Sequence, residues 1–300
     1  MSVLAVWCNR VSSTRLKDKC ASGEPLTVAE HVMARIARAK SVRQIILALP
    51  DGPEQRPLAV WGASHGLPII YGPEHDVVSR FGKAVDRYAQ PGDLIFRVMA
   101  DQPFLDWRAI DFSASVMTAN GWDFALPLTF DRDPVYGAGL SPWSMRAWKW
   151  IESRSHGEER EHVGMILRRH LKEFEYGLVS LPHWAFRPYR LEMDTSQDIL
   201  LMNSIWARWR AGGGEGEPSL QEVVALLDRN RDISMLNGMI HEKTGPYTSY
   251  TVAEIAAWEK DYINRQVVYP DLPSAIGFIE AKSATCRKCN GPLITVRLGS

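Results

Sequence analysis

Hydroxyl and cationic side chains are concentrated in a short segment that directly follows the apolar stretch Val3–Cys8. Those that could contact a phosphate are Asn9, Arg10, Ser12, Ser13, Thr14, Arg15 and Lys19. Arginine offers a fork of donors, lysine offers a point charge, and a turn between a strand and a helix adds main-chain N–H groups. The segment predicts a phosphate-binding loop, although its composition alone also suits a solvated basic loop.

Two aspartates lie where a divalent cation could be held. Asp101 follows the apolar stretch Leu94–Met99 and precedes Gln102, a second polar side chain, and Asp194 occurs in a later polar segment. Carboxylate oxygens are the ligands that Mg²⁺ prefers, and the end of a strand fixes their position. Each aspartate could instead cap a helix, but Asp106 is the better cap candidate near Asp101. Asp101 therefore remains available to hold Mg²⁺, and Asp194 could either cap the following helix or supply a second carboxylate.

A third polar motif is Arg160-Glu161-His162, which we expect to open a helix over residues 160–170. A cation and an imidazole can bind a sugar carboxylate or hydroxyl, whereas a lone histidine near a helix start is more often structural. The residue types alone leave both roles open.

The chain also contains a Cys-x-x-Cys pair, Cys286 and Cys289, near its C-terminus. This spacing is typical of metal or redox ligands, but one pair supplies only two of the four ligands of a tetrahedral Zn²⁺ site. Histidines or a second chain would have to complete the site.

The first two hundred residues alternate short apolar stretches with amphipathic ones. This alternation predicts an α/β fold, a three-layer Rossmann-like arrangement with a mostly parallel sheet. In such sheets ligands collect at the carboxyl ends of the strands, where the polar residues above are expected to lie. The expected strands are 3–8, 44–49, 67–71, 94–99, 124–128 and 176–181, and the expected helices are 27–39, 57–65, 77–88, 143–153 and 196–209.

The Gly-rich segment 212–218 is the clearest linker signal in the chain. We place a catalytic domain at 1–211 and a small helical C-terminal extension at 219–300. Within the extension, 220–227 and 252–262 are predicted to be helical, while 267–273 and the last fifteen residues are predicted to be irregular.

The composition is that of a globular enzyme, with 45% hydrophobic residues and 35 basic residues balanced by 35 acidic ones. A neutral chain creates no global field for a polyanion, so nucleic-acid binding is not expected without a local basic patch. No apolar run approaches the roughly 20 residues of a membrane span. The four cysteines form no disulfide framework, so we expect a cytoplasmic protein.

In their order along the chain, these motifs resemble those of the spore-coat polysaccharide protein F homologues and related CMP-sugar synthetases, in the acylneuraminate cytidylyltransferase superfamily. The matching loop positions are Arg10, Ser13, Thr14, Arg15, Leu16 and Lys19, while Ser12 stands where the family has glycine and Lys17-Asp18 where it has Pro-Gly. The segment 190–198 is similar to the family's Arg-Leu-x-x-Asp-Thr-Pro-Glu-Asp, in which the first Asp supplies a second carboxylate to the metal, so the resemblance assigns Asp194 to Mg²⁺ together with Asp101. Arg160-Glu-His-Val163 matches a family motif that the resemblance places near the acceptor sugar, so we assign Arg160, Glu161 and His162 to substrate binding and not to catalysis.

The resemblance implies a GT-A-like fold and Mg²⁺-dependent transfer of CMP from CTP to a sugar, with release of pyrophosphate for glycan or polysaccharide synthesis. It makes Arg10, Lys19 and Asp101 the catalytic residues, and it suggests that 220–237 is an accessory or homodimer element. Two alternatives remain open: a glycosyltransferase of similar architecture that uses a finished nucleotide sugar, and a non-catalytic nucleotide-binding scaffold.

Overall fold

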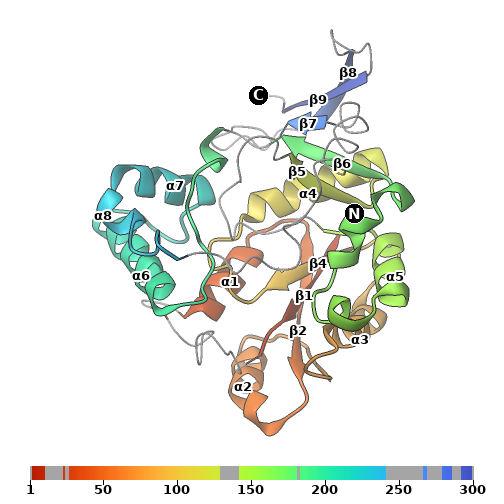
Figure 1. Ribbon diagram of the computed structural model, residues 1–300, viewed down its shortest axis with the longest axis horizontal. Coiled ribbons are helices and arrows are strands. Elements are labelled where there is room, and N and C mark those ends of the chain that lie inside the picture. The colour runs from red at the N-terminus through yellow and green to blue at the C-terminus, as the bar shows by residue number, and fades with distance from the viewer. Residues whose placement is uncertain are drawn as a thin grey trace.

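A computed structural model describes residues 2–10, 23, 27–128, 142–180, 183–240, 266–268, 279–285 and 292–298. Its centre is a parallel sheet (Figure 1). The first four strands are β1 (Val3–Cys8), β2 (Val42–Pro50), β3 (Ile69–Gly72) and β4 (Leu94–Met99). They pair in the order β3-β2-β1-β4. All four carboxyl ends therefore meet at one edge of the sheet.

The second part of the sheet is joined to the first through one residue, Trp143. Its strands are β5 (Phe124–Leu128), β6 (Tyr176–Ser180) and β7 (Gln266–Val268), and they pair in parallel in that order. Trp143 forms antiparallel bridges to Ile95 of β4 and to Phe124 of β5. The main chains of Ile95 and Trp143 exchange two hydrogen bonds of 2.8 Å each. The predicted mostly parallel sheet is confirmed.

Helices cover both faces of the sheet, which makes three layers. The helices are α1 (Val28–Ile36), α2 (Arg56–Ser64), α3 (Val77–Tyr88), α4 (Trp107–Asn120), α5 (Met145–Arg154), α6 (Ser196–Ala211), α7 (Leu220–Arg229) and α8 (Arg231–Ser234), with short 3₁₀ turns at η2 (Pro53–Gln55) and η6 (His183–Ala185). Alternate residues of β1 enter two different cores: Val3, Ala5 and Trp7 pack with α1, α4, α6 and α7, and Leu4 and Val6 pack with α3 and α5. Burial on both faces explains the continuously apolar strands.

Side-chain caps fix where several helices begin. Thr27 and Glu30 form a capping box at α1, and the Asp76 carboxylate accepts the main-chain N–H of Ser79 at α3. Asp106 accepts the main-chain N–H of Arg108 at α4, which confirms its predicted role as a cap. Each cap satisfies N–H groups that would otherwise be unpaired at a helix start.

The helix predicted over 160–170 is wrong. The region consists of three short 3₁₀ helices, η3 (Gly157–Arg160), η4 (Met165–Arg169) and η5 (Leu171–Glu173). Gly164 interrupts the segment with a φ of 90°, and a Cβ at this position would overlap the ring of Trp143. Only glycine combines that backbone with so close an approach.

The C-terminal extension begins with α7 and α8, which lie beside α6 at the left of Figure 1. Leu220, Val223 and Leu227 are buried in the same core as β1, so α7 is packed against the elements that precede residue 212. Its apolar side chains are thus covered within the chain itself.

The extension also contains strands, which corrects the expectation that it is helical and ends irregularly. Within 267–273, residues 267 and 268 belong to β7, and β8 (Ile279–Thr285) pairs antiparallel with β9 (Pro292–Leu298). The predicted helix at 252–262 lies outside the described residues. Among the described helices, none has the length and apolar character needed to cross a membrane.

Candidate active site

The candidate site lies at the carboxyl ends of β1 and β4, which are neighbours in the sheet. Cys8 is paired with Met99 in this register, so the residues that follow each strand emerge side by side. Asn9 is buried, with 3% of its surface exposed, and its Oδ1 accepts the main-chain N–H of Arg10 at 2.8 Å. This bond fixes the first turn after β1, where the predicted phosphate loop begins.

The two aspartates assigned to Mg²⁺ lie in adjacent segments. The main-chain N–H of Met193 donates to the carbonyl oxygen of Asp101 over 2.8 Å, which places Asp194 beside the end of β4. Asp194 is 2% exposed and Asp101 is half-buried. Gln102 follows, and its carbonyl oxygen accepts the N–H of Leu105 at 3.1 Å in a tight turn. Residues separated by more than ninety positions thus meet at one sheet edge.

Arg190 is surrounded by carboxylates. Its Nη2 donates to Asp194 Oδ2 at 3.0 Å, its Nε lies 3.3 Å from Asp198 Oδ1, and its Nη2 is 3.9 Å from Glu192. Burial alone would lower the pKa of Arg190, but the charges of Asp198, Glu192 and Asp194 outweigh it and raise the pKa. Arg190 is therefore a fixed cation that orients the Asp194 carboxylate.

Arg10 connects the start of the phosphate loop with the predicted acceptor motif. Its Nη1 lies 3.5 Å from Glu74 and 3.9 Å from Glu161. All three side chains are roughly 40% exposed, so these contacts are screened and weak. Arg10, which we assigned to the nucleotide, and Glu161, which we assigned to the acceptor, therefore lie next to each other.

Arg160 joins the predicted acceptor motif to the start of α3 through an ion pair. Its Nε lies 2.9 Å from the carboxylate of Asp76, which also caps that helix. Although burial would raise the pKa of Asp76, hydrogen bonds from Arg160 and from the main chain of Ser79 hold it below its usual range. Arg160 is thus engaged with the protein, whereas the side chain of His162 is exposed.

Two arginines near Cys8, the buried Arg80 and the partly buried Arg97, were missed by sequence reasoning. Arg97 of β4 and Arg80 of α3 approach Cys8, and in each arginine Nε is buried without a hydrogen-bond partner among the described residues. Burial raises the pKa of the Cys8 thiol despite the two arginines, so the thiol stays neutral. Burial likewise lowers the pKa of Arg97. The sequence did contain a signal for this pair, because Arg97 interrupts the apolar stretch Leu94–Met99.

Several predicted site residues lie outside the described residues: Ser12, Ser13, Thr14, Arg15, Lys19, Cys286 and Cys289. In the part of the chain that is described, no cluster of three or more histidine, cysteine, aspartate or glutamate side chains could hold a metal ion. Asp101 and Asp194 are two hard oxygen donors in adjacent segments, a set that fits Mg²⁺ when substrate phosphates and water supply the other ligands.

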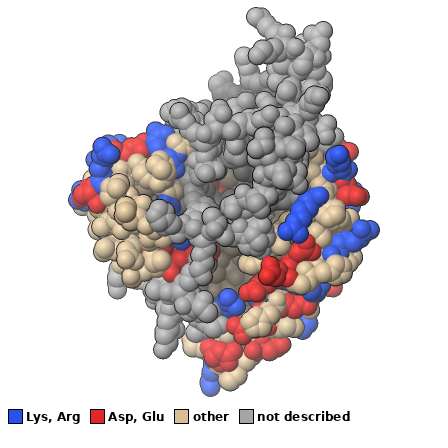
Figure 2. Space-filling view, viewed as in Figure 1, with Lys and Arg blue, Asp and Glu red and all other residues tan. Residues whose placement is uncertain are grey.

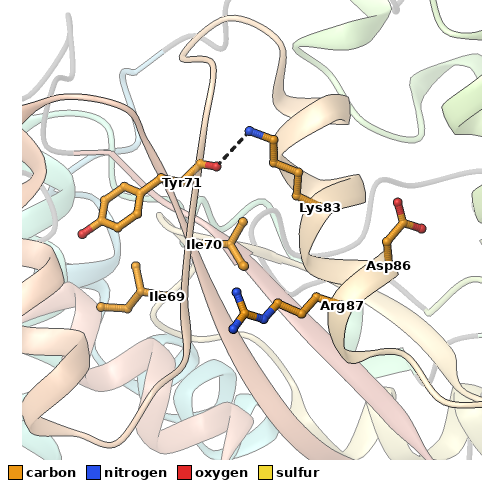
Figure 3. Close-up of a pocket in the computed structure, with 6 residues that line it drawn as sticks. All are labelled: Ile69, Ile70, Tyr71, Lys83, Asp86 and Arg87. Atoms are coloured by element: carbon orange, nitrogen blue, oxygen red, sulfur yellow. Dashed lines mark hydrogen bonds between the residues drawn. The ribbon is translucent and has the colours of Figure 1, made fainter.

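A separate surface hollow of about 630 Å³ lies along the edge strand β3 and α3. It is lined by Ile69, Ile70, Tyr71, Lys83, Asp86 and Arg87 (Figure 3). Lys83 Nζ donates to the main-chain oxygen of Tyr71 at 3.2 Å. A lysine across an edge carbonyl blocks pairing with another strand, so this hollow is a protected sheet edge. None of the predicted site residues lines it.

Charges of both signs are interspersed over the described surface shown in Figure 2. Basic and acidic residues alternate there, in keeping with the balanced composition. On this face the described surface forms no extended basic patch of the kind that binds nucleic acid.

Comparison with solved structures settles the fold. A cytidylyltransferase from Leptospira borgpetersenii serovar Hardjo-bovis superposes with a TM-score of 0.70 at 19% identity, covering 80% of this chain and 99% of that one. The chain has the cytidylyltransferase fold. A CMP:2-keto-3-deoxy-manno-octonic acid synthetase complexed with CTP superposes with a TM-score of 0.51 at 13% identity, over 69% of this chain and 99% of that one.

Sequence comparison covers most of the chain but gives no function. The uncharacterized protein MJ1063 of Methanocaldococcus jannaschii is 23% identical over 251 residues, which cover 81% of this chain and 98% of that protein. The chain matches no established family profile.

Proposed function

We propose that this protein is a nucleotidyltransferase that transfers CMP from CTP to a sugar hydroxyl and releases pyrophosphate. The observation that carries the proposal is the hydrogen bond between Met193 N–H and the Asp101 carbonyl. It joins the segment that carries Asp194 to the end of β4, and β4 lies next to β1, after which the predicted phosphate loop begins. The fold is shared with a synthetase whose structure contains CTP, which supports a cytidine nucleotide as the substrate.

In this proposal each polar side chain of the candidate site has one role. Asp101 and Asp194 hold Mg²⁺, which when bound would polarise the α-phosphate and offset the charge on its oxygens. Arg10 leaves Glu74 and Glu161 to contact the phosphates, together with Arg15 and Lys19. Arg160, Glu161 and His162 line the acceptor side. The sugar hydroxyl attacks the α-phosphorus, an O–P bond forms, and the bond to pyrophosphate breaks.

The resemblance of the ordered motifs makes an acidic sugar for a surface polysaccharide the first acceptor to test. Arginines near the acceptor motif favour an anionic substituent, because a guanidinium pairs with carboxylate through two parallel hydrogen bonds. Arg160 is the candidate within this motif, and its side chain is partly exposed while its Nε pairs with Asp76.

Pyrophosphate release tests the proposal directly. The purified protein is incubated with CTP, Mg²⁺ and a panel of acidic and neutral sugars, and pyrophosphate is measured in an enzyme-coupled assay. We expect release with at least one sugar, its loss on chelation of Mg²⁺, and a fall of at least about a hundredfold in kcat for Asp101→Asn and Asp194→Asn. Asp86→Asn is the matched control, because Asp86 is an exposed partner of Lys149 on α3 and α5.

The two alternatives give different results in the same experiment. Transfer from a finished nucleotide sugar without pyrophosphate release would identify a glycosyltransferase. Thermal stabilisation by CTP without turnover of any acceptor would identify a scaffold. Unchanged turnover in both aspartate variants of an active protein would remove the proposed cation site.

A further inference from the structure

One side chain of the C-terminal extension, Asn237, hydrogen-bonds the segment that carries Asp194. This residue is 3% exposed and lies beyond α8. Its Nδ2 donates to the main-chain oxygen of Arg190 at 3.0 Å and to Asp198 Oδ1 at 2.8 Å. Both hydrogens of the amide are therefore used on the segment that carries Asp194.

Asp198 passes this contact on to Asp194. It is fully buried, and its Oδ2 accepts the main-chain N–H groups of Asp194 at 2.9 Å and of Thr195 at 2.8 Å. Its Oδ1 accepts from Asn237 and from Arg190 Nε, and Arg190 in turn donates to the Asp194 carboxylate. Asp198 thus fixes the Asp194 main chain directly and its carboxylate through Arg190.

Asparagine suits this position better than its nearest substitutes. An aspartate at 237 would place a second carboxylate against Asp198, and an apolar residue would leave the Arg190 carbonyl and Asp198 Oδ1 each short of a donor. A buried hydrogen-bond network destabilises the fold when some of its polar groups lack partners, and it is rigid when every group has a partner. Residues that hydrogen-bond a metal ligand directly typically change metal affinity by 10–100-fold when they are removed. Asn237 acts on Asp194 one step further out, through Asp198 and Arg190.

We propose that Asn237 is a positioning residue for the Asp194 carboxylate, which makes the C-terminal extension a structural part of the divalent-cation site. The inference rests on the proposed function, since it takes Asp194 as a cation ligand. Asn237 does not touch the substrate. It sets the orientation of Asp194, so its removal weakens cation binding more than it weakens nucleotide binding.

Manganese binding tests this inference without relying on turnover. Free Mn²⁺ is measured by electron paramagnetic resonance during titration of the full-length protein with a CTP analogue that cannot be cleaved between the α- and β-phosphates. For Asn237→Ala we expect the half-saturating Mn²⁺ concentration to rise at least about tenfold. Binding of the analogue without metal should stay within about twofold of wild type. Asn237→Ser, which keeps a small polar side chain, is the second variant in case the alanine variant does not fold.

Asn230→Ala is the matched control. Asn230 lies in the same extension, and its hydrogen bonds of 2.7 Å each join it to Leu226 and to Arg208 of α6, away from Asp194. We expect its Mn²⁺ binding to equal that of wild type. If both folded Asn237 variants bind Mn²⁺ as wild type does while Asp194→Asn does not, the inference fails and the proposed function stands. If Asp194→Asn also binds Mn²⁺ normally, the proposed cation site and the inference both fail.

Discussion

A buried ion pair between α1 and the segment predicted to be a linker gives the sharpest stability prediction. Arg35 is fully buried, and its Nε lies 3.1 Å from Oε2 of Glu217, which is about one-tenth exposed. These two atoms are not aligned for a hydrogen bond, so the contact is an ion pair. Arg35 also donates to the carbonyl oxygens of Pro218 at 2.6 Å and Leu105 at 3.3 Å. Burial lowers the pKa of Arg35 to about 10, so it remains charged at neutral pH.

The cost of breaking the pair follows from this burial. Removing one partner of a buried pair destabilises a protein by about 3–5 kcal/mol, because the other charge stays uncompensated. Since the two charged atoms lack hydrogen-bond alignment, we take the lower end, about 3 kcal/mol for Arg35→Met. That is a fall of roughly 6 °C in the melting temperature of a chain of this size. Glu217→Gln keeps an acceptor for His31 and should cost about 2 kcal/mol.

Urea unfolding followed by tryptophan fluorescence measures these free energies. Trp206 stacks on His31 beside the pair, with ring centroids 4.5 Å apart. The double variant Arg35→Met/Glu217→Gln should lose at least about 1 kcal/mol less than the sum of the single losses, because it leaves neither charge unpaired. As a control, Asp232→Asn breaks an exposed pair with Arg208 and should cost at most about 1 kcal/mol. A loss below about 1 kcal/mol for Arg35→Met, or strict additivity, would refute the reasoning.

Two further predictions concern acid stability and core packing. Burial alone would raise the pKa of Asp198, but hydrogen bonds from Asn237, the main chain of Asp194 and Thr195 hold it below its usual range. This carboxylate therefore stabilises the fold fully above its unfolded pKa of about 4, and the stabilisation is lost as the pH falls through the folded pKa. Asp198→Asn should flatten the loss of unfolding free energy below about pH 4 in urea titrations at several pH values, and an unchanged slope would contradict this account. Gly177→Ala should destabilise by about 1–3 kcal/mol in thermal unfolding, because its Cβ would overlap the Trp122 ring. At Gly238 a Cβ would meet no atom closer than 3.5 Å, so Gly238→Ala should change little, and equal effects of the two would count against the packing argument.

The sequence predicted those elements whose signals are local. The helix 77–88 is found at the predicted residues because an apolar face with helical periodicity follows a capping aspartate, Asp76. The strand 3–8 is a continuous apolar stretch, and the strand 94–99 is apolar except for Arg97. The helix expected at 160–170 is absent because Gly164 has a positive φ and packs closely against the ring of Trp143, a residue distant from it in the sequence. Apolar and polar side chains alternate along 292–298, which is a strand signal, but the composition near the chain end obscured it.

The candidate site was predictable residue by residue but not as an arrangement. Asp101 was proposed from its position after an apolar stretch and Asp194 from the resemblance of 190–198 to a family motif, yet the hydrogen bond that joins their segments depends on the path of the whole chain. Arg35 and Glu217 likewise lie in elements far apart in the sequence. Such contacts follow from tertiary packing, which no local pattern encodes.

The position of β7 at the edge of the sheet has a consequence for synthesis on the ribosome. β6 receives its second neighbour only when residues 266–268 pair with it. Until that part of the chain emerges, β6 presents unpaired main-chain groups along an open edge, where a strand of another nascent chain could pair. A protein cut short before residue 266 would keep its first four strands complete and yet carry a permanently open edge. We expect this truncated protein to aggregate rather than to unfold.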